Sequence, residues 1–212
     1  MNAEFTNALT NGLHALCLLM YFLVAARATQ RDDERFTGSV VGIFLLIFVL
    51  KMLGVFVHYA PKGPGWAEMW VGIGLGLVLL HYVIMQTLRF PSHYRLMGLL
   101  FASTCTVLFL MRHDFIFLAV EILVFNLAAA LYGRGLLRIG FAGVVLSVVV
   151  WIAARKGAET WLGGELPTAW RYDNDLFHFM LIASTFIIFR GFARGDGVPE
   201  RFGAAVEEAE TA

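Results

Sequence analysis

Residues 38–57 read GSVVGIFLLIFVLKMLGVFV and contain one charged side chain, Lys51. At about 1.5 Å per residue, a helix of this length matches the roughly 30 Å hydrocarbon core of a bilayer. A helix that is apolar on every face has to be buried in protein or in lipid. The stretch therefore predicts a transmembrane helix, which we extend to residues 37–59.

Six further apolar stretches are separated by short polar breaks, and the predicted spans are 8–27, 37–59, 66–89, 93–113, 115–133, 137–155 and 170–190. The shortest break is Arg112-His113-Asp114. We interpret it as a tight turn, because a single helix of about 40 residues would overshoot the membrane about twofold. The sequence thus predicts an all-α bundle of seven transmembrane helices over residues 1–190, followed by a short tail at residues 191–212.

The composition points to lipid as the solvent, since 59% of the residues are hydrophobic and only 15% are charged. The 16 basic and 16 acidic residues cancel, which disfavours a nucleic-acid partner and leaves membrane lipids as the expected surroundings. The sequence contains no Gly-rich phosphate loop, serine-nucleophile elbow, Cys-x-x-Cys pair or zincin helix. Nucleotide enzymes, acyl hydrolases of the soluble type and redox modules are therefore disfavoured.

The distribution of basic residues predicts the orientation. With seven helices, ten Lys and Arg residues fall on the side that holds the C-terminus and five on the other. Basic residues are retained on the cytoplasmic side of a membrane. We therefore expect a multi-pass protein of the cell membrane with its N-terminus outside and its C-terminus in the cytoplasm.

Several ionisable residues lie inside the predicted helices, where a charge costs at least about 2.5–3.5 kcal/mol, so they often mark function. Counting the helical rise from the N-terminal side places Lys51, Glu121 and His178 about 10–12 Å deep, and His14 roughly 13 Å deep. Four helices are thus expected to bring ionisable groups to one level. His81 falls about 23 Å down its helix and is expected to be a hydrogen-bonded packing residue.

Two interpretations fit this level. The simpler one is a structural ion pair between Lys51 and Glu121, in which each charge offsets the desolvation of the other. The second is a metal or proton-handling site built on His178 and Asp175, in which His178 would bind zinc, Asp175 would be a ligand or orient the histidine, and His58 at the outer rim could close the site. In that site Glu121 or Glu68 would act as the general base for a zinc-bound water. Bis-histidine haem ligation would need His14 to face His178.

The segment Asn174-Asp175-Leu176-Phe177-His178, together with seven helices and an outside N-terminus, resembles the CREST superfamily of membrane hydrolases and receptors. This superfamily includes the alkaline ceramidases and the progestin and adiponectin receptors. The resemblance implies a zinc site in which His178 matches the second of two seventh-helix histidines, and His58 the ligand of the second helix. Asn174 stands in place of the first histidine, no serine precedes His58 by one turn, and the third helix offers Glu68 where the family has an aspartate.

Three functions follow as hypotheses. The first is a metal-dependent hydrolase of a lipid substrate. The second is a small-solute or proton-coupled transporter that uses Lys51, Glu121 and His178 as a relay. The third is a non-catalytic membrane scaffold, in which Lys51 and Glu121 only hold the bundle together.

Overall fold

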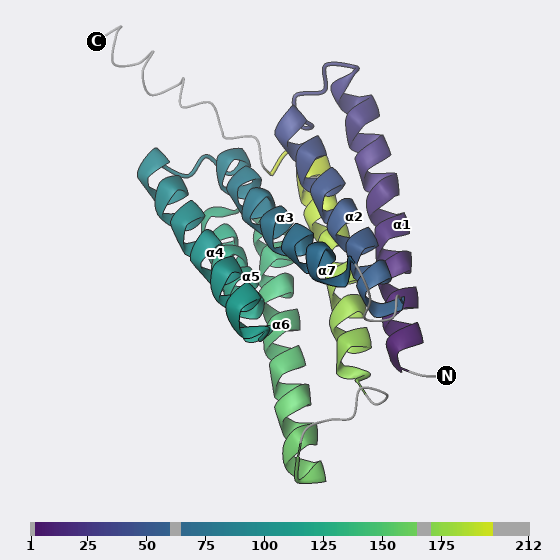
Figure 1. Cartoon of the computed structure of the whole chain (residues 1–212). Coiled ribbons are helices and arrows are strands. Elements are labelled where there is room, and N and C mark those ends of the chain that lie inside the picture. Colours follow the sequence, from purple (N-terminus) through teal and green to yellow (C-terminus); the bar gives the residue numbers. More distant parts are fainter. Residues whose placement is uncertain (1–2, 60–64, 165–170, 197–212) are drawn as a thin grey trace, which may run out of the picture.

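The computed structural model describes residues 3–59, 65–164 and 171–196. Within these residues the chain forms seven helices that run alternately in opposite directions (Figure 1). They are α1 (Ala3–Thr29), α2 (Gly38–Tyr59), α3 (Trp66–Thr87), α4 (Ser92–Arg112), α5 (Ile116–Tyr132), α6 (Gly135–Leu162) and α7 (Asp173–Arg194). The predicted helical bundle is confirmed, and the segment 197–212 of the predicted tail lies outside the described residues.

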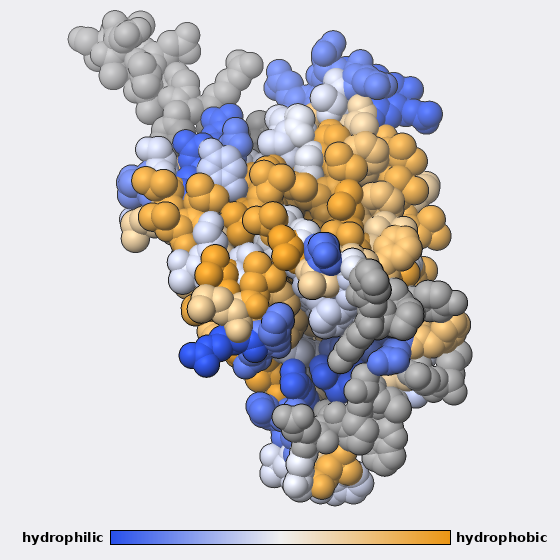
Figure 2. Space-filling model, in the orientation of Figure 1, coloured by the Kyte–Doolittle hydropathy of each residue, from blue (hydrophilic) through white to orange (hydrophobic). Residues whose placement is uncertain are grey.

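The surface of the bundle has the character of a membrane protein. Six of the helices in the described ranges are long and apolar enough to cross a membrane, whereas α5, with 17 residues, is shorter. Large apolar side chains such as Leu16 and Met20 are exposed on the outer faces. Figure 2 shows an apolar band across the molecule with hydrophilic residues gathered toward both ends. By length, the structure supports six spans rather than the predicted seven.

The helix boundaries follow from local chemistry. His113 adopts a left-handed conformation (φ 53°) that ends α4, and the Asp114 carboxylate accepts the backbone N–H of Ile116 at 3.0 Å. This arrangement satisfies a free N–H at the start of α5. The predicted tight turn between residues 112 and 114 is therefore confirmed. α6 runs to Leu162, seven residues beyond the predicted end at 155.

Six helices form a closed ring. α1 packs against α2 and α7, α2 against α3, α3 against α5, and α6 against both α5 and α7. α4 packs only against α3 and α5 among these contacts and so lies outside the ring. The candidate site lies at the centre of this ring.

The α6–α7 side of the ring is packed at very short distance. A Cβ built on Gly140 would lie 2.5 Å from Cγ1 of Ile188 and 2.8 Å from its backbone nitrogen. Across the same contact, a Cβ on Gly191 would lie 2.8 Å from the backbone nitrogen of Leu137. Small residues let helix backbones approach closely in lipid, where no hydrophobic effect drives helices together.

One end of the ring is filled by aromatic side chains from α1, α2 and α7. The ring of Tyr21 stacks on that of Phe189 with centroids 4.7 Å apart, and the rings of Phe44 and Phe192 meet edge to face at 6.2 Å. Phe36 joins the group through Phe189. These rings close the bundle at the end where α1 ends and α2 begins.

Candidate functional site

A cavity of about 180 Å³ lies between the six ring helices. Most of its wall is aliphatic or aromatic, and it includes Ile47, Leu77, Val144, Phe177 and Leu181. Cavities of about 150 Å³ lined by such side chains stay dry and admit molecules the size of benzene. This cavity therefore has room for one small apolar group.

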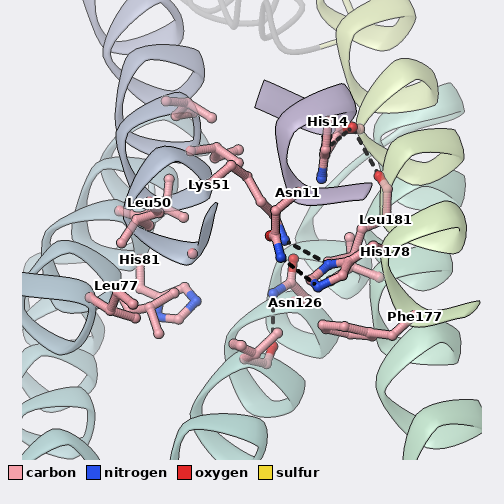
Figure 3. A pocket seen from close by; sticks show the side chains of 18 of the residues that line it. Asn11, His14, Leu50, Lys51, Leu77, His81, Asn126, Phe177, His178 and Leu181 are labelled. Carbon is pink, nitrogen blue, oxygen red and sulfur yellow. Dashed lines mark hydrogen bonds between the residues drawn. The ribbon is translucent and has the colours of Figure 1, made fainter. Parts of the chain in front are cut away.

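Polar side chains of the wall come from α1, α2, α3, α5 and α7, and those of α1, α2 and α7 are joined by hydrogen bonds (Figure 3). Asn11 Nδ2 lies 2.9 Å from His178 Nε2, and Lys51 Nζ lies 3.2 Å from His178 Nδ1. The second N–H of the Asn11 amide donates to the carbonyl of Asn7 at 2.9 Å. Both nitrogens of His178 are thus engaged by protein groups.

Asp175 lies one turn before His178 on α7 but serves a different contact. Its carboxylate accepts hydrogen bonds from the hydroxyls of Thr6 at 2.6 Å and Thr10 at 3.1 Å. Both threonines belong to α1, so Asp175 holds the start of α7 against α1. This contact gives a buried carboxylate two donors, as burial of a charged group requires.

His14 contributes an unpartnered nitrogen. Its Nε2 lies 2.9 Å from the hydroxyl of Thr185, and that hydroxyl donates to the carbonyl of Leu181 at 2.9 Å. When the Thr185 hydroxyl donates to this carbonyl it accepts from His14, and the imidazole proton then lies on Nε2 and leaves Nδ1 as an acceptor. Nδ1 is buried and has no hydrogen-bond partner in the described part of the chain. Figure 3 shows this side chain beside those of Lys51 and Asn11.

His81 faces this group from the opposite wall of the cavity (Figure 3). Its Nδ1 lies 2.8 Å from Glu121 Oε1, and neither side chain is more than 1% exposed. The ring of Phe125 stacks on the imidazole with centroids 4.3 Å apart and an angle of 6° between the planes. The carboxylate and the stacked ring together fix the orientation of His81.

The predicted ion pair between Lys51 and Glu121 is wrong, because Glu121 contacts His81 and Lys51 contacts His178. The depth estimates assumed upright helices that share one starting level. Figure 1 shows instead that α3 is inclined to α6 and that the helices begin at different heights. The expected separation of His81 from Glu121 by about 13 Å of depth therefore does not exist.

The predicted zinc ligands are not brought together as a metal site. His58 and His178 do approach, with ring centroids 6.5 Å apart, but both nitrogens of His178 contact protein groups and Asp175 accepts from threonines. Within residues 3–59, 65–164 and 171–196, no group of three or more His, Cys, Asp or Glu side chains is arranged to hold a metal ion. The two residues predicted as general bases do not join His58 and His178 either, since Glu68 is exposed on α3 and Glu121 is paired with His81.

Several residues of the site were not predicted, above all Asn11, Thr6 and Thr10 of α1. A signal for them exists in the sequence. Asn7, Asn11 and His14 recur at intervals of four and three residues, which places them on one face of a helix. This polar stripe, within an otherwise apolar helix, marks the face of α1 that contacts α7.

No protein-family model matches this sequence, and no curated protein or solved structure was found to be similar to it. The resemblance to the CREST superfamily stays a prediction. The functional argument therefore depends on the cavity and on the groups in its wall.

Proposed function

We propose that this protein binds a small, largely apolar molecule with one carbonyl group in the cavity between its helices. The observation that carries the proposal is a largely apolar cavity of about 180 Å³ in which Asn11, Lys51 and His178 form a hydrogen-bonded polar group. Small-molecule sites have this composition, in which apolar walls provide affinity and a few placed polar groups provide orientation. The size fits one aromatic ring or a short aliphatic chain.

The groups on the polar side select the chemistry of the ligand. The hydrogen bond that Lys51 Nζ makes in the described part of the chain is to His178, so hydrogens of the amine can donate toward a ligand oxygen. His14 Nδ1 is a buried acceptor that lacks a donor. No aspartate or glutamate is among the described residues that line the cavity. A neutral ligand that accepts a hydrogen bond from Lys51 fits this wall, and the carbonyl is the simplest such group.

The two ends of the cavity differ, which suggests the side from which a ligand arrives. The aromatic cluster around Tyr21 and Phe189 fills the bundle at one end. At the other end the wall includes His58, which is half-buried and lies at the last turn of α2. We propose that the ligand enters past His58, on the side that the distribution of Lys and Arg assigns to the outside.

This binding site is compatible with two of the three functions expected from the sequence. A hydrolase and a carrier both need a cavity for a small molecule, whereas a scaffold does not. For the hydrolase, zinc would have to displace existing partners of His178 and Asp175. Ligand binding is therefore the step to test first.

The experiment is a titration of the detergent-purified protein with 4-fluoroacetophenone, followed by ¹⁹F NMR. We expect saturable binding to the wild type and its loss in Val144→Phe, because Val144 is buried in the cavity wall and a phenyl ring would fill the space. The matched control is Leu146→Phe in the same helix, where the side chain is 55% exposed on the outer face. This control is expected to bind as the wild type does.

Comparison with Val144→Phe and with empty micelles separates binding to the protein from partition of the ketone into the micelle. Equal signals from wild type, Val144→Phe and empty micelles would show that the ketone only dissolves in detergent, and this result would overturn the proposal. Both variants are checked for helix content and monodispersity before the titration.

A further inference from the structure

We infer that Lys51 is a nucleophilic amine that forms an imine with a small aldehyde held in the cavity. This inference rests on the proposed function, because the same cavity holds the carbonyl compound. It goes further in assigning a covalent step to one residue. The geometry that points to it is the chain of hydrogen bonds from Asn7 through Asn11 and His178 to Lys51.

Each hydrogen in this series of hydrogen bonds, from Asn7 to Lys51, can be assigned to a donor. The Asn11 amide nitrogen has two hydrogens, one donated to the carbonyl of Asn7 and the other to His178 Nε2. Since Nε2 accepts, a neutral His178 carries its hydrogen on Nδ1. Nδ1 then donates across 3.2 Å to Lys51 Nζ. An ammonium group has no lone pair to accept this bond, so the arrangement calls for the neutral amine.

The surroundings of Lys51 favour the same state. The titratable side chains that share the cavity wall with Lys51 in the described structure are four histidines: His14, His58, His81 and His178. Two of the carboxylates near the cavity are engaged elsewhere, Asp175 by Thr6 and Thr10, and Glu121 by His81. A partly buried cation that has no carboxylate partner is costly in an apolar cavity, and a lysine desolvated in this way is activated as a neutral nucleophile.

Lys156 of the same protein has very different surroundings from those of Lys51. Its Nζ lies 2.8 Å from Glu159 and its side chain is 72% exposed, so a carboxylate and solvent both surround this amine. An exposed lysine with a pKa near 10.4 is unprotonated in only about one part in 2,500 at pH 7. An amine that is already neutral therefore has a large advantage as a nucleophile.

The reaction is balanced with water as its only by-product. The Nζ lone pair of Lys51 attacks the aldehyde carbon, and the C=O π electrons move to oxygen. Transfer of one proton from nitrogen to oxygen gives a carbinolamine; His178 can relay it by giving its Nδ1 hydrogen to the alkoxide oxygen and taking one from the positively charged nitrogen in exchange. The hydroxyl then leaves as water as the second N–H hydrogen is lost and the C=N bond forms. The unpartnered Nδ1 of His14 can accept the carbinolamine O–H.

The test is reductive trapping with benzaldehyde and cyanoborohydride at pH 7, followed by peptide mass spectrometry. The sequence has three lysines, Lys51, Lys62 and Lys156, so each modified peptide identifies its site. We expect Lys51 to be labelled at least about tenfold more than Lys156, although Lys51 is partly buried and Lys156 is exposed. Val144→Phe should suppress the labelling of Lys51 and leave that of Lys156 unchanged, whereas Leu146→Phe should leave both unchanged.

A second variant tests the hydrogen-bond chain itself. Asn11→Leu removes the donor to His178 Nε2, which frees His178 to take its other tautomer and lets Lys51 become an ammonium. Labelling of Lys51 should then fall at pH 7 and recover at higher pH, a shift that a loss of packing alone would not produce. Circular dichroism and size-exclusion chromatography identify any variant that fails to fold.

One outcome separates this inference from the proposed function, and two others overturn it. If 4-fluoroacetophenone binds but labelling follows exposure, with Lys156 modified and Lys51 spared, Lys51 is only a hydrogen-bond donor and the covalent step is overturned. If the ketone does not bind and Lys51 is not labelled, both proposals fail. Labelling of Lys51 that Val144→Phe leaves intact would also overturn the inference, since the aldehyde would then reach the amine by another route.

Discussion

The partner of Glu121 can be determined by double-mutant cycles, and the structure makes a specific prediction for them. Glu121 is fully buried, with its Oε1 2.8 Å from His81 Nδ1. Removal of one member of a buried pair costs about 3–5 kcal/mol, because the other is left uncompensated. In a membrane, a single hydrogen bond between helices averages only about 0.6 kcal/mol, with a maximum near 1.7. We therefore expect a coupling energy of about 1–3 kcal/mol between Glu121 and His81.

The assay is unfolding in mixed detergent micelles, followed by circular dichroism, for Glu121→Met, His81→Phe and the double variant. A second cycle pairs Glu121→Met with Lys51→Met. The structure predicts additivity in this second cycle, within about 0.5 kcal/mol, because Lys51 contacts His178 instead. A large coupling of Glu121 to Lys51 with none to His81 would refute the assignment and restore the ion pair predicted from the sequence.

Two further predictions concern the packing of α6 and the loop between α1 and α2. Gly140→Ala should destabilise the protein by about 1–3 kcal/mol, since the new Cβ would lie 2.5 Å from Ile188, whereas Gly157→Ala in the same helix, with nothing within 4 Å, should be neutral or stabilising in the same unfolding assay. In the loop between α1 and α2, a hydrogen bond from Arg35 holds the pKa of Asp33 below its ordinary value. Arg35→Gln should raise that pKa in an NMR titration. The stability contributed by this pair should be present at neutral pH and lost as the pH falls through the folded-state pKa, so a stability difference that persists unchanged at low pH would contradict it.

The helices were predictable because each one follows from the apolar residues of its own segment. A run of about 20 apolar residues predicts a span wherever it occurs, and the turn at Arg112-His113-Asp114 could be inferred from the length limit that the bilayer imposes. The ends were less accurate, since α1 begins at Ala3 and α6 continues to Leu162. Polar residues extend both helices beyond their apolar runs, and hydropathy alone does not register them.

The candidate site was predictable only in part. Lys51 and His178 were expected at one depth, but their 3.2 Å contact was not itself predicted. The partner of Glu121 was not predictable, because depth along a helix fixes neither its tilt nor the direction in which a side chain points around the axis. Those two quantities depend on which helices become neighbours, and that order is a property of the folded ring rather than of any single segment.

The stripe of Asn7, Asn11 and His14 shows what a closer reading of periodicity can recover. Its spacing marks the contact face of α1 without any knowledge of the partner helix. The identity of the partner, α7, came only from the structure. Polar stripes within apolar helices are therefore a better guide to such sites than depth is.

The central claim, that the cavity binds a small carbonyl compound beside Lys51, is tested most directly by determining a crystal structure with 4-bromoacetophenone and locating the bromine by anomalous scattering. We predict one bromine site among the apolar residues of the cavity, near Leu77 and Val144, with the carbonyl oxygen directed to Lys51. A bromine signal found only on the lipid-facing surface, with the cavity unchanged, would contradict the account.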